Sequence, residues 1–242
     1  MIVFILPIVA LFMTVSIPVM NQSSYPPQDI LLIDDFEEYK DGELPLRWKY
    51  LEEHGLVQVE PHHMRPDEEF FVVQEGGNKF LRAFTEGEAV HLSMANGEDF
   101  DWNLKTHPYL SWDWRANKLP EGASEDNPRR NDAGLGFYVT FYFKKGLLLK
   151  RPVSIKYTYS SSLPVGTVLK QGVLRVIVVS NGKDGYGDWE QIERNVWEDY
   201  RNAFGKNPPE RPLSIRLWSD SDDTNQIGEG DFDNIKLAES PR

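Results

Sequence analysis

The sequence of 242 residues contains no cysteine. This absence excludes disulfide bridges, catalysis by a thiolate and anchoring through a lipid-modified cysteine. The fold must therefore be stabilised by packing, alone or together with a bound metal ion.

No cluster of lysine and arginine occurs either. The chain has 26 Lys and Arg residues against 38 Asp and Glu residues, which gives a formal net charge of -12 and a pI near 4.9. Binding of nucleic acid needs a concentrated basic surface, so DNA and RNA are excluded as partners. The acidic balance instead favours divalent cations or neutral ligands.

Charged side chains are missing from the N-terminal region, where Asp29 is the first. Residues 1–20 are predominantly apolar, and about twenty such residues suit either a signal peptide or a membrane span. We therefore expect residues 1–22 to be a signal peptide or membrane anchor, residues 23–29 a linker, and residues 30–238 the folded domain. The protein is expected to be exported to the periplasm or the extracellular space, with membrane contact only through an uncleaved N-terminal segment.

Long segments with helical periodicity are scarce. Short alternating or β-branched segments recur instead, separated by Gly, Pro, Asn and Asp, and this pattern predicts an all-β fold, an antiparallel β-sandwich or jelly roll. In residues 195–204, apolar side chains recur at three-to-four spacing between a suitable N-cap, Asn195, and Gly205, so we expect one short helix there. The expected strands are residues 30–33, 56–60, 70–75, 79–85, 89–95, 109–117, 135–143, 153–160, 173–180, 213–218 and 231–237.

Side chains alternate between the two faces of a strand, so the sequence also predicts which of them face the core. The predicted inward set of residues 135–143 is Leu135, Phe137, Val139, Phe141 and Phe143, and the outward set is Tyr138, Thr140 and Tyr142. The same alternation turns Arg216 and Trp218 outward. Aromatic rings beside hydrogen-bonding groups suit a sugar ligand. The alternative is a solvated sheet surface, or one that lies beneath a second layer.

Two acidic segments lie at opposite ends of the expected domain. The first and last strands of a sandwich often run side by side, and calcium prefers six to eight oxygen ligands. We therefore expect a structural Ca²⁺ site formed by Asp35, Glu37, Asp231 and Asp233. The alternative is that these are ordinary surface carboxylates at strand ends.

Motifs that would identify an enzyme are not found. There is no nucleophile elbow, Walker loop or dinucleotide-binding fingerprint. Glu190 and Glu193 are the best candidates for the two carboxylates of a glycosidase. Their spacing of three places them on opposite faces of an extended strand, so catalysis has no support from the sequence.

Four segments resemble a family of bacterial proteins, the domain of unknown function 3047. They are LSWDWRANKLPEG, NDAGLGFYVTF, WEQIERNVWEDYRNAFG and SDSDDTN, in the expected order. The resemblance implies an exported sandwich of galactose-binding-like or lectin-like form. It also draws attention to residues within the four segments, among them Trp114, Arg115, Asp132, Arg194, Asp220 and Asp222. The DDFE opening and the DFDNIKL ending are similar to those of carbohydrate-binding jelly rolls, where such ends can hold calcium.

The leading hypothesis is an exported, non-catalytic module that binds a carbohydrate or another cell-envelope polymer. Its expected ligand-binding residues are Trp114, Arg115, Asp132, Tyr138, Tyr142, Arg194, Arg216, Trp218, Asp220 and Asp222. One alternative is a polysaccharide hydrolase or lyase, in which the arginines and carboxylates of this set would converge in one cleft. Another is a structural envelope protein without a ligand.

Overall fold

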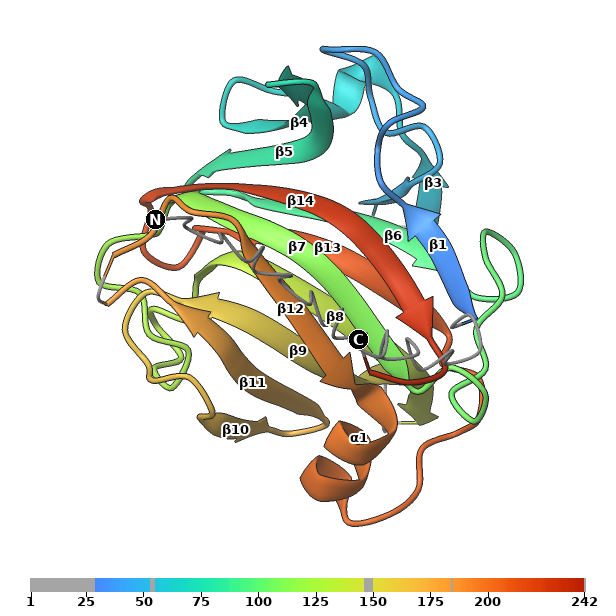
Figure 1. Cartoon of the computed structure of the whole chain (residues 1–242). Coiled ribbons are helices and arrows are strands. Elements are labelled where there is room, and N and C mark those ends of the chain that lie inside the picture. The colour runs from blue at the N-terminus through green and yellow to red at the C-terminus, as the bar shows by residue number, and fades with distance from the viewer. Residues whose placement is uncertain (1–28, 53–54, 146–149, 184, 242) are drawn as a thin grey trace, which may run out of the picture.

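The computed structural model describes residues 29–52, 55–145, 150–183 and 185–241. Two β-sheets lie face to face, and one short helix packs at an end of the sandwich (Figure 1). The predicted all-β sandwich is therefore confirmed. The expected leader, residues 1–22, and most of the expected linker lie outside the described residues. No helix in these four described segments is long and apolar enough to cross a membrane.

Sheet A has six strands, all antiparallel to their neighbours. Its spatial order is β12 (Glu190–Asn195), β7 (Tyr109–Lys118), β14 (Ile227–Ala238), β5 (Asn78–Glu86) and β4 (Glu68–Glu75). The sixth strand, β1 (Ile30–Asp34), pairs with the C-terminal part of β14. The first and last strands of the domain therefore do run side by side, as expected.

Sheet B has eight strands. Its spatial order is β10 (Val168–Gln171), β11 (Leu174–Asn181), β9 (Lys150–Ser160), β8 (Ala133–Lys145), β13 (Ser214–Asp220), β6 (Ala89–Ala95), β2 (Lys49–Glu52) and β3 (Gly55–Gln58). Strands β9 and β11 are parallel, and every other pair is antiparallel. A single 3₁₀ turn, η1 (Pro61–His63), follows β3.

The core between the sheets is built on the alternation that the sequence predicts. Trp112 and Trp114 of β7 are fully buried, and their neighbours in the chain, Asp113 and Arg115, point to the opposite side of sheet A. The Trp112 ring stacks on Phe137 of sheet B with a centroid distance of 4.7 Å. These rings remove a large apolar area from water and account for much of the stability of the sandwich.

The predicted helix is also confirmed. Helix α1 (Val196–Phe204) begins after Asn195, whose side-chain oxygen accepts a hydrogen bond from the Glu198 amide at 3.0 Å. It ends at Gly205, which adopts the left-handed conformation at φ 72°, where a side chain would be strained. Tyr200 packs edge-on against Phe141 at 4.5 Å, so the helix closes one end of the core.

The alternation predicted for β8 fails beyond Thr140. The register of β8 against β9 shifts between Thr140 and Tyr142, as in a β-bulge. A bulge inserts one extra residue and exchanges the two faces beyond it. Phe143, which was predicted to face the core, is for this reason 55% exposed.

Candidate functional site

The outer face of sheet B, turned away from the core, gathers a set of polar and aromatic side chains from four neighbouring strands. Trp218 of β13 lies opposite His91 of β6. Tyr138 of β8 lies opposite Arg216 of β13 and also opposite Lys156 of β9. Residues paired across a sheet point to the same face, so these side chains share one surface. We call this set the floor, and it comprises His91, Tyr138, Lys156, Arg216, Trp218 and Asp220.

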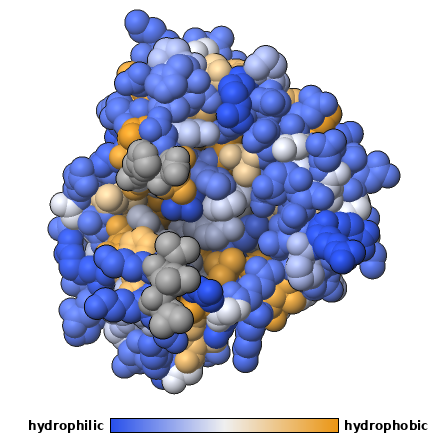
Figure 2. Space-filling view, turned by 180° about the vertical axis from the view of Figure 1, so that it is seen from behind, coloured by the Kyte–Doolittle hydropathy of each residue, from blue (hydrophilic) through white to orange (hydrophobic). Residues whose placement is uncertain are grey.

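Figure 2 looks onto this side of the molecule, from behind the view of Figure 1, and shows it hollowed near the middle, with both hydrophilic and hydrophobic residues at the border. Hollows of this kind are the usual location of small-molecule and oligosaccharide sites.

The three rings of the floor stand in a row. The Trp218 indole lies between His91, whose ring centre is 3.4 Å away, and Tyr138, whose ring is stacked on it at 4.8 Å. These neighbours come from the strands on either side of β13. The indole faces are therefore largely occupied, and the floor presents ring edges and polar groups rather than one broad flat ring.

Lys156 lies in the centre of the floor. Its side chain is buried, and its ammonium lies 5.6 Å from the centre of the Tyr138 ring and 6.0 Å from that of Trp218. Gly136 provides the space for it, because a Cβ at that position would lie 3.1 Å from Lys156 Cε. Among the described residues no carboxylate forms an ion pair with this ammonium. Burial lowers the pKa of Lys156, but the contact with Tyr138 and the charges of Asp220 and Glu125 outweigh burial and raise the pKa above its usual value.

Arg216 is the second cation of the floor. Its Nε donates a hydrogen bond to Ser93 Oγ at 3.0 Å, and its guanidinium carbon lies 5.7 Å from the centre of the Trp218 ring. Burial lowers the pKa of Arg216 from its usual value. No carboxylate in the described segments of the chain pairs with it.

Asp220 and His91 complete the floor. Burial raises the pKa of Asp220 to about 7, against the opposing effect of the Lys156 charge, and Asp222 and Asp132 raise it further. Burial lowers the pKa of His91 to about 3, and the charges of Arg216 and Lys156 act in the same direction. His91 is therefore neutral near pH 7, and its Nε2 atom is buried with no hydrogen-bond partner.

One rim of the floor is formed by residues 119–132, which fold over β9. The buried Glu125 carboxylate accepts hydrogen bonds from Thr158 Oγ1 at 3.0 Å and from Ser160 Oγ at 2.6 Å. At the end of this segment the buried carboxylate of Asp132 accepts the backbone N–H groups of Asp223 and Thr224 at 3.0 and 2.7 Å. Asp132 thus holds the turn after β13.

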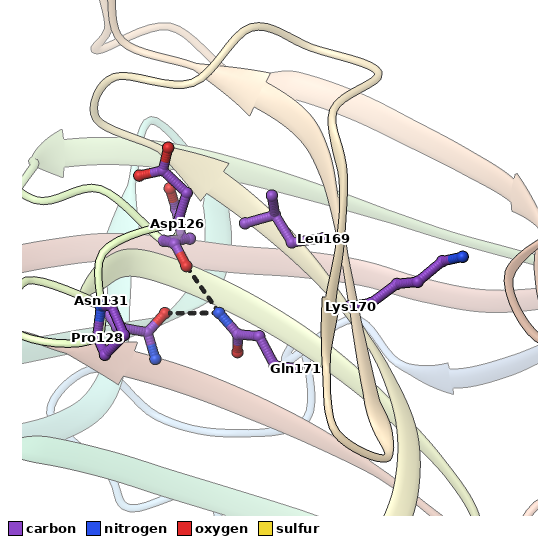
Figure 3. Close-up of a pocket in the computed structure, with 7 residues that line it drawn as sticks. Asp126, Pro128, Asn131, Leu169, Lys170 and Gln171 are labelled. Carbon is purple, nitrogen blue, oxygen red and sulfur yellow. Dashed lines mark hydrogen bonds between the residues drawn. The ribbon is translucent and has the colours of Figure 1, made fainter.

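A pocket of about 550 Å³ lies on the same face, between this segment and β10. Gln171 of β10 spans it and donates from Nε2 to the Glu125 carbonyl at 2.7 Å and to Asn131 Oδ1 at 3.3 Å (Figure 3). Leu169 also lines the pocket, and the strand registers place it on the sheet face that carries Lys156. The pocket therefore continues the floor toward the edge of sheet B.

Of the ten residues predicted to bind a ligand, Tyr138, Arg216, Trp218 and Asp220 lie in the floor. Asp132 and the exposed Asp222 lie beside it. The oxygens of these two aspartates and of Asp223 lie within 4.8 Å of one another. Because Asp132 is already saturated by the backbone of the turn, we interpret the group as a structural turn.

The other four predicted residues lie elsewhere, and Trp114 is the clearest correction. It is 0% exposed in the core, where its Nε1 donates to Ser180 Oγ at 3.1 Å, so it presents no surface to a ligand. Tyr142 follows the bulge in β8 and is carried to the side of sheet B that holds α1. There it packs against the core, and its hydroxyl accepts a hydrogen bond from Lys206 at 2.9 Å.

Both remaining arginines are held by carboxylates. Arg115 lies on the outer face of sheet A, where it pairs with Asp231 at 2.7 Å and with Glu75 at 2.8 Å. Arg194 lies near α1 and pairs with Asp199 at 2.6 Å. Neither reaches the floor. The cleft that the hydrolase alternative requires is therefore not assembled by the described residues.

His91 and Lys156 belong to the floor but were not predicted from the sequence. Each is a single polar residue inside a strand whose other residues on that face are small or hydroxylated. The available signal was the alternation itself, which places Lys156 opposite the apolar side chains of Ile155 and Tyr157.

The four acidic residues expected to bind calcium do not form one ligand set. Asp231 is fully buried on the outer face of sheet A, where Arg82, Arg115 and Asn117 all donate to it. Glu37 accepts the Lys79 backbone N–H at 2.9 Å.

Asp233 and Asp35 are close enough to interact. Burial raises the pKa of Asp233 to about 6, and the charges of Asp113 and Asp35 raise it further. Asp113 Oδ1 is buried without a hydrogen-bond partner. Among the described residues, neither these three carboxylates nor the four predicted ones form a group whose oxygens all lie within 4.8 Å of one another. Calcium binding itself stays a prediction.

Several solved structures are similar to this chain. The family 11 carbohydrate-binding module of a cellulosomal cellulase of Clostridium thermocellum shares 13% sequence identity, with a TM-score of 0.43, over 87% of this chain and 95% of that one. The family 30 module of another cellulosomal cellulase of that organism shares 15%, with a TM-score of 0.42, over 88% and 99%. A carbohydrate-binding module that recognises mannan shares 13%, with a TM-score of 0.30, over 72% and 85%. At such values these structures say nothing about the ligand of this chain.

No curated protein sequence matches this chain. The family model described as protein of unknown function (DUF3047) matches residues 55–236, which is most of the chain. The resemblance carried by the four sequence segments is confirmed, and the chain belongs to the DUF3047 family.

Proposed function

We propose that this protein is a non-catalytic carbohydrate-binding module whose binding surface is the floor on sheet B. One observation carries the proposal. Four adjacent strands bring aromatic rings, two cations and a carboxylate together on one outer sheet face, and neither cation forms an ion pair there with a carboxylate of the described residues.

The chemistry of a sugar suits such a surface. Sugar hydroxyls need both donors and acceptors, and the floor offers donors on Lys156 and Arg216 and acceptors on Asp220. His91 Nε2 adds a buried polar atom without a partner. A buried polar group usually has a hydrogen-bond partner, and a bound ligand would supply one here. The pocket at β10 would extend the contact to further units of an oligosaccharide.

A matched pair of tryptophan variants tests the proposal. The purified chain is screened against a panel of polysaccharides by affinity electrophoresis, and the dissociation constant of each bound one is measured by calorimetry. We expect Trp218→Ala to weaken binding at least about tenfold, because Trp218 packs against His91 and Tyr138 and lies beside both cations, so its loss removes the packing that positions these groups. Trp189→Ala is the control, since Trp189 is 38% exposed beside Arg115 on the outer face of sheet A.

The proposal is wrong if no polysaccharide is retarded, or if Trp189→Ala weakens binding and Trp218→Ala does not. A thermal melt of both variants ensures that a loss of binding is not a loss of fold.

We also propose export, which the apolar and uncharged residues 1–22 support. Cell fractionation and N-terminal sequencing of the mature protein test it. A chain that stays in the cytoplasm with an intact N-terminus would contradict it.

A further inference from the structure

Neither cation of the floor forms an ion pair with a carboxylate of the described residues, although both lie on a sheet face with little exposure to water. Arg216 makes one hydrogen bond, to the Ser93 hydroxyl. Lys156 forms no ion pair within the described residues; burial lowers its pKa, but its contact with Tyr138 and the charges of Asp220 and Glu125 outweigh burial and raise the pKa. Both side chains are largely removed from water. A charge in such a position costs stability unless a partner of opposite charge neutralises it. The described residues therefore leave Arg216 without a neutralising partner, whereas Lys156 is partly neutralised by Asp220 and Glu125.

Other half-buried arginines show how this fold usually satisfies a guanidinium. Arg115 is held by Asp231 and Glu75, and Arg194 by Asp199. Arg175, which has no carboxylate, donates to three backbone carbonyls instead. Arg216 has neither kind of partner for its terminal nitrogens.

The ring geometry makes charge the dominant means of recognition at this site. His91 and Tyr138 lie against the Trp218 indole at 3.4 and 4.8 Å, so little ring face is free for a sugar to stack on. Both cations surround the same ring, since Lys156 Nζ and Arg216 Cζ lie 6.0 and 5.7 Å from its centre. A ligand seated over Trp218 would meet both positive charges.

We propose that the floor binds an acidic polysaccharide composed of uronic acids, and that the partly exposed Arg216 holds the carboxylate of one sugar unit while the buried Lys156 adds positive charge beneath it. This inference rests on the proposed function and specifies its ligand class. A carboxylate accepts two parallel hydrogen bonds from the terminal nitrogens of a guanidinium, and such charge-assisted bonds are strong.

Uronates fit the site better than sulfated sugars do. The carboxylate of a uronic acid is bonded directly to a carbon of the sugar ring, whereas a sulfate ester extends further out through an additional oxygen. Groups that lie about 6 Å from the Trp218 ring centre are within reach of a carboxylate on a sugar seated at that ring.

The net charge of -12 does not prevent this recognition. At physiological ionic strength, exposed charges more than about 8 Å away are largely screened, whereas contacts inside a desolvated hollow are not. The positive charge of the floor, rather than the net charge of the protein, therefore determines whether an anionic sugar binds there. Long-range repulsion would slow association rather than abolish it.

The test uses the complete chain and four polymers that differ in their charge and in the group that carries it. They are polygalacturonate, its fully methyl-esterified form, dextran sulfate and an uncharged galactan. We expect polygalacturonate to bind, and the methyl ester to bind at least about tenfold more weakly, because esterification removes one charge-assisted contact per unit. Arg216→Met and Lys156→Met should each weaken binding of polygalacturonate by a similar factor. Arg201→Met, which removes an exposed arginine from α1, is the control of equal charge and should change nothing.

The outcomes separate this inference from the proposed function. If the galactan or the methyl ester binds as tightly as polygalacturonate and Trp218→Ala abolishes that binding, the floor is a carbohydrate site but the uronate inference is wrong. If dextran sulfate binds equally well through Arg216, the commitment to a carboxylate is wrong. If Arg201→Met weakens binding as much as Arg216→Met does, attraction is non-specific and the inference is wrong.

Discussion

The outer faces of the two sheets carry similar side chains, but only one of them balances its charges internally. On sheet A, Arg82 and Arg115 converge on the buried carboxylate of Asp231, and Arg115 also contacts Glu75 and the ring of Trp189. On sheet B, two cations surround a tryptophan without forming an ion pair. A fully paired group stabilises the fold and offers nothing to a ligand. An unpaired group costs stability and leaves its interactions available.

The largest expected effect is at the centre of the paired face. Asp231→Asn leaves two arginines with a neutral partner, and breaking a buried ion pair in this way costs about 3 kcal/mol or more. Urea denaturation should show this loss in the free energy of unfolding, with binding by the folded fraction unchanged. A loss below about 1 kcal/mol would mean that water replaces the Asp231 carboxylate as the partner of the two arginines. The two sheet faces would then not differ in how they satisfy their charges.

Matched arginine variants compare the two faces directly. Arg115→Met should reduce the free energy of unfolding by about 2 kcal/mol, because Asp231 and Glu75 lose a partner. Arg216→Met should change it by less than about 1 kcal/mol, or increase it, because it removes a cation that has no counter-ion. Equal losses in the two variants, measured in the same denaturant series, would contradict the assignment of stability to one face and binding to the other.

The pH dependence of stability tests the charge balance of the floor. Burial raises the pKa of Asp220 from 3.8 to about 7, so the folded chain binds this proton more tightly than the unfolded chain does. Protonation of Asp220 therefore stabilises the folded state relative to the unfolded state. This contribution is fully present below pH 3.8 and is lost as the pH rises through about 7.

Asp220→Asn should therefore be more stable than the wild type at pH 8 by about 1 to 2 kcal/mol, with no gain at pH 4. Denaturation curves at the two pH values measure the difference. Asp231→Asn is the comparison variant, and its loss should be present at pH 8. A variant Asp220→Asn that is less stable than the wild type at pH 8 would show that Asp220 and Lys156 stabilise each other.

The smallest expected effect concerns the carboxylates of sheet A that have no arginine. Asp233 accepts hydrogen bonds from Asn78 and Asn234, and its negative neighbours are Asp35 and Asp113. If calcium binds there, millimolar calcium should raise the melting temperature by about 2 to 4 °C relative to a chelator. Asp233→Asn should abolish that increase. An unchanged wild-type melting temperature would contradict the calcium prediction.

The sequence predicts those features that depend on neighbouring residues. The capping residues and three-to-four spacing identified α1, and the alternation in β8 identified the buried face of Leu135, Phe137 and Val139. Strands β2, β10 and β12 were missed because they are short and carry few apolar residues. The bulge in β8 was missed because one inserted residue leaves no trace in composition, and Tyr142 was assigned to the wrong face as a result.

The site was less predictable because its members are far apart in the chain. The sequence placed Arg115 among the expected ligand-binding residues but could not show that Asp231, 116 residues away, would bind it. In the same way, His91 and Lys156 are ordinary strand residues until β6, β13, β8 and β9 are placed side by side. Pairing between distant segments decides whether a charge is satisfied, and local patterns carry no information about it.

The place of β14 in sheet A has a consequence for how the protein is made. This strand pairs with β1, β5 and β7, all of which precede it in the chain. The N-terminal end leaves the ribosome first. Strands β5 and β7 therefore lack the strand that pairs with both of them until residues 227–238 emerge. Strands that are distant in sequence pair slowly. Until they pair, their exposed edges can associate with other chains. Half of this sandwich can therefore be completed only after translation of its last strand.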